Sequence, residues 1–108
     1  METLEVLKSA RELLSDSKRW TRGWYARDKY GHRKMWNSDN AVRYCSMGAV
    51  HKVAGNRHPN AIMYLNRIIN PLHPDDIIVV GYNDNHTHKD ILEMFDKAID
   101  LCEKENKK

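Results

Sequence analysis

The sequence predicts an α+β domain that is mainly helical, with about four helices and one small β-hairpin. Apolar residues recur at helical spacing in four segments, 2–15, 39–54, 59–69 and 88–104. A fifth segment, 23–36, is rich in strand-forming aromatic residues and contains a glycine turn. The chain has 108 residues, which suits a single domain. We expect it to span 1–108, with a frayed tail at 104–108.

The first half of the chain gives a helix, the hairpin and a second helix. Polar residues of the run SDSK end the first helix, 2–15. The hairpin at 23–36 must pack on helices, because an isolated hairpin is only marginally stable in water. Ser38 or Asp39 caps the second helix, 39–54, and Gly55 stops it in the left-handed conformation.

The second half gives two helices and one ambiguous segment. Pro59 suits the first turn of the helix at 59–69. The run IIVVGY at 77–82 has four consecutive β-branched residues, which favours a buried strand. A short helix is the alternative. A polar turn at 83–85 follows, and Thr87 caps the last helix with Asp90 three positions on.

The apolar faces of these helices define the expected core. Cys45 and Cys102 fall on such faces, so both are expected to be buried free thiols. No apolar run approaches the ~20 residues that span a bilayer, and no signal peptide is recognisable, so we expect a cytoplasmic protein without membrane contact. The expected core residues are Leu7, Leu14, Val42, Cys45, Ala49, Ile62, Leu65, Phe95, Ala98 and Ile99.

Aromatic and basic residues are interleaved between Lys18 and Trp36, and this segment holds all three tryptophans. Flat rings beside guanidinium groups suit a ligand with a base to stack on and phosphates to pair with. A helix N-terminus near Asn83 also favours an anion. The structural alternatives are packing for the tryptophans, an ion pair for Arg27 and an Asx turn for Asn83. The expected ligand-binding residues are Arg22, Trp24, Tyr25, Arg27, Asn83 and Asp84.

Signs of catalysis or of a metal site are weak. The sequence lacks a glycine-rich phosphate loop, and Ser46 and His51 are five residues apart, so they point in different directions on a helix. The spacing of His73, His86 and His88 matches no zinc signature. We therefore expect no enzyme, no cofactor and no metal. The net charge of +3 is low for a surface that tracks duplex DNA, so nucleic acid is the less favoured partner.

Several motifs occur in the order of a family pattern. They are ARELL at 10–14, RWTRGWYARD at 19–28, AVRYCSMGAV at 41–50, YND at 82–84 and FDKAI at 95–99. Together they resemble a small uncharacterised domain family of actinobacterial and phage proteins, over residues 4–101. Tyr82 stands where that family usually has tryptophan. This resemblance implies one domain and brings no established catalytic residues.

A second, fainter resemblance is to phage proteins that sequester the cyclic ADP-ribose-type signals of Thoeris immune systems, and it rests on size and residue inventory. It implies a non-enzymatic homo-oligomer in the host cell cytoplasm that sequesters a small phosphorylated nucleotide, such as a cyclic signal, and so counters host defence. The alternative is a protein-interaction or nucleic-acid-binding module that uses the aromatic and basic hairpin as its contact surface.

Overall fold

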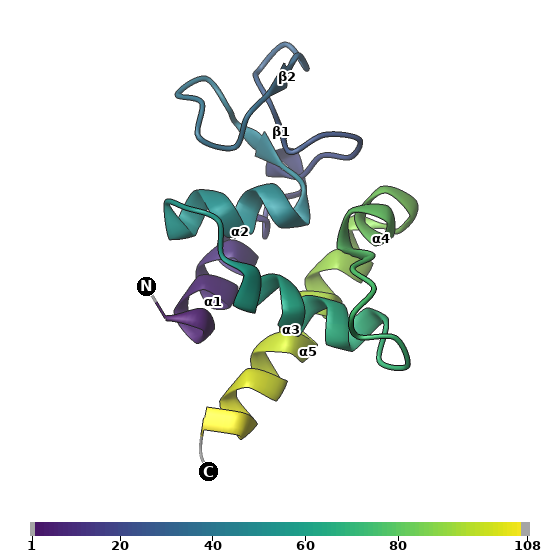
Figure 1. Cartoon of the computed structure of the whole chain (residues 1–108). Coiled ribbons are helices and arrows are strands. Elements are labelled where there is room, and N and C mark those ends of the chain that lie inside the picture. Colours follow the sequence, from purple (N-terminus) through teal and green to yellow (C-terminus); the bar gives the residue numbers. More distant parts are fainter. Residues whose placement is uncertain (1, 107–108) are drawn as a thin grey trace.

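Helices dominate the computed structural model, which describes residues 2–106 (Figure 1). The fold is α+β and mainly helical, as the sequence predicts. Within these residues the α-helices are α1 (Thr3–Leu13), α2 (Ser46–Ala54), α3 (Pro59–Ile69), α4 (Val79–Asn85) and α5 (His88–Asn106), and a 3-10 turn, η1, covers Ser17–Arg19. The strands are β1 (Ala26–Arg27), β2 (Arg33–Lys34) and β3 (Arg43–Tyr44).

The core lies among four of the helices. α1 packs against α2 and α5, and α5 packs against α3. Phe95 and most other expected core residues are buried. Val42 was expected there wrongly, since it is 45% exposed and lies before β3 rather than on a helix. Ile99 is only partly buried, against the edge of the core.

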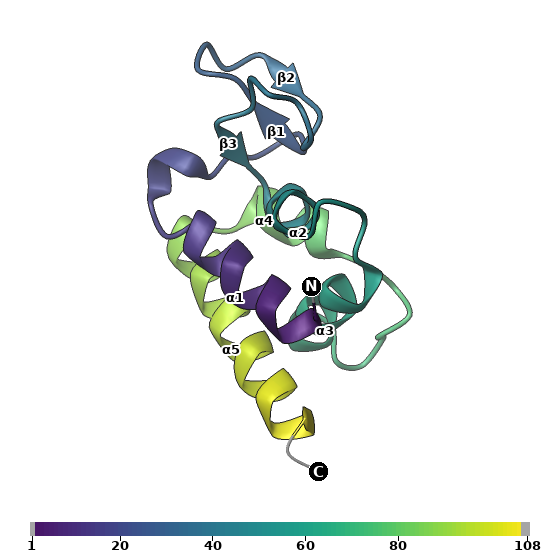
Figure 2. The same cartoon turned by 90° about the vertical axis from the view of Figure 1, so that its left-hand side faces the viewer.

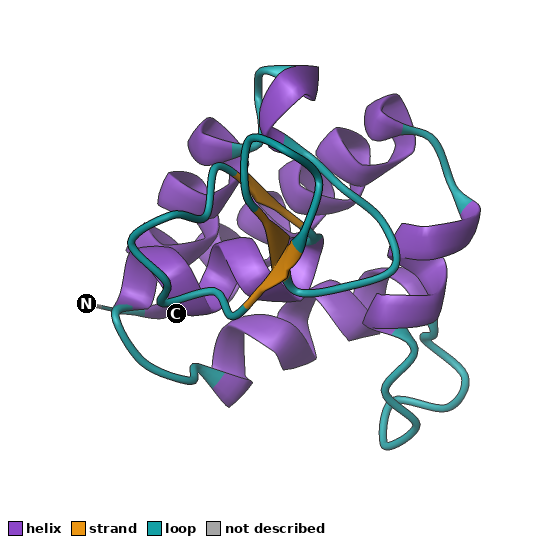
Figure 3. Cartoon of the chain, turned by 90° about the horizontal axis from the view of Figure 1, so that it is seen from above, coloured by secondary structure: helices purple, strands orange, loops and turns teal. Residues whose placement is uncertain are grey.

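The small sheet lies at one end of the helical layer (Figures 2 and 3). Its strand order is β2-β1-β3, and both pairings are antiparallel. The predicted hairpin at 23–36 is confirmed by β1 and β2. Asp28 shapes its turn, because one carboxylate oxygen accepts hydrogen bonds from the backbone N–H groups of Tyr30 and His32, both at 2.9 Å. The third strand, β3, was not predicted from the sequence.

The start of the second helix was predicted seven residues too early. Residues 39–45 form a loop and β3, and α2 begins at Ser46. The reason is that β3 pairs with β1, which holds this stretch extended. The cap is therefore neither Ser38 nor Asp39 but Cys45, whose Sγ accepts a hydrogen bond from the Gly48 N–H at 3.3 Å. The predicted end is confirmed, since Gly55 has φ 72°.

The predicted strand at 77–82 is wrong, and the alternative of a short helix is right. α4 covers Val79–Asn85, so 83–85 is helical rather than a turn. Asn66 of α3 arranges the approach to this helix, because its amide donates to the carbonyls of Pro74 and Asp76 at 3.0 and 3.1 Å. Its side-chain oxygen also accepts from the Ile78 N–H at 2.9 Å. These contacts from a buried side chain replace the partner strand that a β-conformation would need.

The last helix starts as predicted and ends later. The Thr87 hydroxyl and the Asp90 carboxylate accept hydrogen bonds from each other's backbone N–H, both at 3.2 Å, which forms a reciprocal cap. Residues 104–106 are helical rather than frayed, and 107–108 lie outside the described residues. No helix in the described range has the length and apolar character needed to cross a membrane.

Candidate functional site

Asn83, one of the expected ligand residues, is fully buried between the sheet and the helices. Its side-chain oxygen accepts from the Trp20 indole N–H at 2.9 Å, the Ser46 N–H at 3.0 Å and the Ser46 hydroxyl at 2.7 Å. Its amide donates to the Thr21 carbonyl at 3.0 Å. The side chain therefore ties α4 to the N-terminus of α2 and to the loop before β1, and its polar atoms are engaged within the protein.

Arg27, expected to meet a phosphate, is also engaged internally. Its guanidinium donates to the Thr21 hydroxyl at 3.1 Å, to the Arg22 carbonyl at 3.1 Å and to the Gly31 carbonyl at 2.9 Å. It thus joins the loop before β1 to the hairpin turn. This differs from the expected alternative of an ion pair with Asp28 or with an acid on the last helix, since these partners are a hydroxyl and two carbonyls.

Arg22 is turned toward α5 rather than toward the other expected ligand residues. Its guanidinium lies over the Trp20 ring, 4.9 Å from the centroid, and donates to the His86 carbonyl. The structure therefore does not bring Arg22, Arg27 and Asn83 together as free groups around one ligand.

Trp24, Tyr25 and Asp84 do come together, in a cleft of about 250 Å³ that we call the aromatic cleft. Gly23, Cys45 and Val80 complete its lining. The two aromatic rings meet edge to face, with centroids 5.9 Å apart and an interplanar angle of 72°. Its charged lining group is the carboxylate of Asp84, which would repel a phosphate.

A close backbone contact fixes the wall of this cleft beside α2. A Cβ atom built on Gly48 would lie 2.1 Å from the Tyr25 carbonyl oxygen, so only glycine fits there. Three residues earlier, Cys45 caps the helix, and burial raises the pKa of its thiol. The order Cys-x-x-Gly in the sequence thus has a structural cause: the cysteine starts the helix, and the glycine lets the chain at Tyr25 lie against it.

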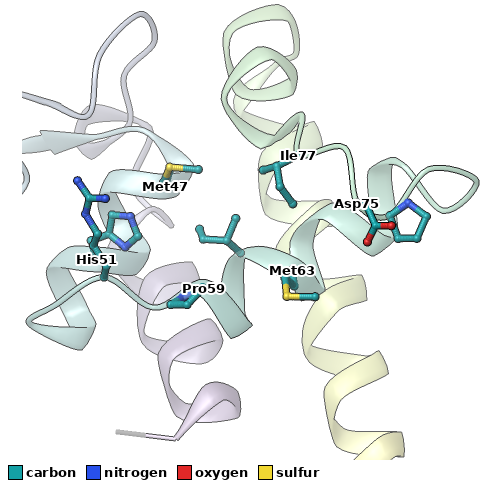
Figure 4. A pocket seen from close by; sticks show the side chains of 9 residues that line it. Met47, His51, Pro59, Met63, Asp75 and Ile77 are labelled. Carbon is teal, nitrogen blue, oxygen red and sulfur yellow. The ribbon is translucent and has the colours of Figure 1, made fainter.

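A larger cavity, about 610 Å³, lies between α2, α3 and the segment that precedes α4. Figure 4 shows Met47 and Ile77 pointing into the space between their elements, with Pro59 and Met63 on the side of α3. His51 lies at one end of this view and Asp75 at the other. Its lining is mostly apolar and consists of Met47, His51, Arg57, Pro59, Ile62, Met63, Pro74, Asp75 and Ile77.

His51 is the buried titratable group of this cavity. Burial lowers its pKa below the ordinary value of 6.5, and the neighbouring Arg57 and His58 lower it further. Its Nδ1 accepts a long hydrogen bond, 3.4 Å, from the His58 backbone N–H. An accepting Nδ1 places the proton of the neutral ring on Nε2. The Trp36 ring packs edge-on against it, with centroids 5.7 Å apart.

Two charged side chains of the cavity are free. Arg57 and Asp75 are exposed, and among residues 2–106 neither side chain has a hydrogen-bond or ion-pair partner. A free guanidinium keeps its planar fork of donors available for an anion. The cavity therefore offers an apolar body, one cationic group, one anionic group and one neutral imidazole.

The sequence-based prediction missed this cavity. Its residues come from three segments, 47–51, 57–63 and 74–77, which are far apart in the chain. The available signal was the run Arg57–His58–Pro59, where two basic or polar residues precede a helix that carries Met63. In the described range, no group of three or more His, Cys, Asp or Glu residues is placed to hold a metal ion.

The chain is thus a mainly helical α+β domain that carries one apolar cavity and one aromatic cleft. It belongs to a family of unknown function, DUF6197, whose model matches residues 1–101. This agrees with the uncharacterised family that the ordered motifs indicate. No curated protein and no solved structure matches the chain.

Proposed function

We propose that this protein is a non-enzymatic binding protein that holds a small phosphorylated nucleotide in the cavity between α2 and α3. The observation that carries the proposal is the pairing of an apolar cavity with the free guanidinium of Arg57. A volume of about 610 Å³ falls in the range of roughly 300–1,000 Å³ that is usual for small-molecule sites.

Each part of the ligand has a matching group. A nucleobase is flat and largely apolar, so it suits a space between Met47, Ile62 and Met63, and thioether sulfurs make favourable contacts with aromatic rings. Arg57 supplies paired donors for a phosphate. His51 supplies one further N–H donor from a neutral ring. The proposed site lies elsewhere than the site expected from the sequence and keeps the expected ligand class.

The lining supports capture rather than turnover. The nine residues of the cavity include no serine, threonine, cysteine or lysine to act as a nucleophile beside His51. Cys45 lines the other cleft, and its raised pKa keeps the thiol protonated, which makes it a poor nucleophile.

The narrower form of this proposal is a role in phage or prophage anti-defence. A protein that sequesters a cyclic nucleotide signal in the host cytoplasm lowers the free concentration of that signal without consuming it. The anti-defence role rests on the sequence resemblance. The cavity supports only the binding of a phosphorylated nucleotide, which this role requires.

Calorimetry with matched ligands tests the proposal. AMP and cyclic nucleotides are expected to bind, and adenosine to bind more weakly. Arg57→Gln should weaken AMP about 10-fold or more, because hydrogen bonds to charged groups contribute about 1.5–3 kcal/mol. It should leave adenosine unchanged. Arg19→Gln, on η1, is the matched control. Mass spectrometry should recover the ligand intact. Equal binding of AMP and adenosine, or equal effects of the two arginine variants, would refute the proposal.

A second candidate, an interface between protein chains, is favoured by exposed apolar side chains around α4. Leu72 is 85% exposed, Ile77 46% and Val80 45%. Patches of this kind mark interaction sites. These exposed side chains are the support for a homo-oligomer, because 77–80 does not form a strand that needs a partner. Light scattering should show a dimeric mass at tens of micromolar and a monomeric mass for Val80→Glu. A monomeric parent protein would end this candidate.

A further inference from the structure

The aromatic cleft is separate from the cavity of the proposed function, and its chemistry is different. It is lined by Trp24, Tyr25, Val80 and Asp84, with Gly23 and Cys45. Trp24 is 39% exposed, so its ring is open to solvent at the mouth. Asp84 is the charged residue of the lining, which includes no basic residue.

Asp84 is held in place through one carboxylate oxygen, and its other oxygen is free of hydrogen bonds in the described chain. Its Oδ1 accepts from the Gly23 N–H at 2.9 Å and from the Asn83 amide at 3.3 Å. These bonds fix the orientation of the carboxylate. Within residues 2–106, Oδ2 accepts no hydrogen bond, and the group has no ion-pair partner. A fixed carboxylate without an ion-pair partner beside two aromatic rings attracts a cation.

The rings themselves suit a cation. The Trp24 and Tyr25 rings are nearly perpendicular, 5.9 Å between centroids, so they form two sides of a corner. Trp24 already contacts one cation of this chain, since the Arg33 guanidinium lies 4.9 Å from its ring centroid. A ring face attracts a cation within about 6 Å, most strongly for tryptophan, and aromatic corners recognise quaternary ammonium groups.

From this geometry we propose that the aromatic cleft binds a quaternary ammonium group of a small molecule. A trimethylammonium head has no N–H to donate and is bulky and weakly hydrated. It gains from ring faces and from a nearby carboxylate rather than from directed hydrogen bonds. The volume of about 250 Å³ suits such a head group and is small for a whole nucleotide. Trp24 and Tyr25 contact the methyl groups, and Asp84 supplies the counter-charge.

Titration of the ¹⁵N-labelled protein with choline, followed by NMR shifts, tests the proposal. The matched ligand is 3,3-dimethylbutan-1-ol, which has the same shape without the charge. Choline should bind with saturable shifts at Gly23 and Asp84. The alcohol should bind about 10-fold more weakly, because it lacks the positive charge that the ring faces and the Asp84 carboxylate attract.

Three variants make the test specific. Asp84→Asn keeps the oxygen that accepts from Gly23, so it should fold, and it should weaken choline by about 5- to 10-fold through loss of the charge. Trp24→Leu should abolish saturable binding. Tyr30→Leu, an exposed ring outside the cleft, is the control and should change nothing. Arg33→Gln should tighten choline, because it removes a positive charge beside the ring.

Several results would overturn the proposal. They are equal binding of choline and its neutral analogue, no effect of Asp84→Asn, or no saturable binding by the parent protein. Arg57→Gln should leave choline binding unchanged, because Arg57 lines the other cavity. The nucleotide proposal and the choline proposal can therefore be refuted independently of each other.

Discussion

Replacing Asn83 with alanine should cost the protein about 3–5 kcal/mol of its free energy of unfolding. This magnitude follows from the polar groups that would lose their hydrogen-bond partner. The Ser46 N–H and hydroxyl are fully buried and would both lose their partner, at roughly 1–3 kcal/mol each. The Trp20 N–H and the Thr21 carbonyl lie in half-buried residues, so water can replace part of their loss.

Urea denaturation followed by circular dichroism measures this cost. A domain of this size has a total stability of about 5–15 kcal/mol, so the midpoint should fall strongly while the slope stays constant. Asn85→Ala is the matched control, because Asn85 is exposed on the same helix and makes one hydrogen bond, to Gly81. It should cost less than about 1 kcal/mol.

The reasoning fails if Asn83→Ala loses less than about 1 kcal/mol, because the hydrogen bonds of Asn83 would then not hold α4, α2 and the loop before β1 together. Should the variant not fold, Ser46→Ala offers a milder test. It removes only one hydroxyl from the same network and should cost about 1 kcal/mol.

Three further predictions concern the core, the close contact and pH. Phe95→Ala should destabilise by about 3–5 kcal/mol in denaturant titration, since Phe95 is fully buried, and a loss under 1 kcal/mol would contradict its core position. Gly48→Ala should destabilise by about 2 kcal/mol or more, because its Cβ would meet the backbone of Tyr25 and not a movable side chain; an unchanged melting temperature would show that this contact relaxes. For His51, the folded pKa is lowered, mainly by burial, so the unfolded chain takes up a proton first and stability falls as the pH drops below about 6.5. His51→Gln should flatten this fall in melting temperature between pH 7.5 and 5.5, and an equally steep fall would show that other groups cause it.

Local signals in the sequence were sufficient to predict the helix boundaries that carry a strong capping residue. Pro59 marks the first residue of α3, Gly55 ends α2 in the left-handed conformation, and Thr87 with Asp90 starts α5. Each signal acts within one helical turn, so neighbours in the chain determine it. The hairpin turn at Asp28 is local for the same reason.

In two segments, contacts with residues distant in the chain determine a secondary structure that differs from the local preference. The second half of the β-branched run, Val79 and Val80, begins a helix, because Asn66 fixes the approach to it and Val79 is buried in the core. In the described chain, no strand lies beside this run to pair with it. Intrinsic strand preference is weak compared with burial and pairing. Residues 39–45 have helical periodicity, but the pairing of Arg43 and Tyr44 with β1 keeps the helix from starting before Ser46.

The candidate sites show the same division. The helical α+β class, the main helices, the hairpin and the buried thiols follow from the sequence alone. Only the tertiary structure shows that the Arg27 guanidinium is bonded to Thr21, Arg22 and Gly31. It also shows that the Asn83 side chain is bonded to Trp20, Thr21 and Ser46, which are distant in the chain. It alone assembles Met47, His51, Arg57 and Ile77 around one cavity. The physical reason is that capping and turn chemistry act over a few residues, whereas the availability of a polar side chain and the shape of a cavity depend on groups far apart in the chain.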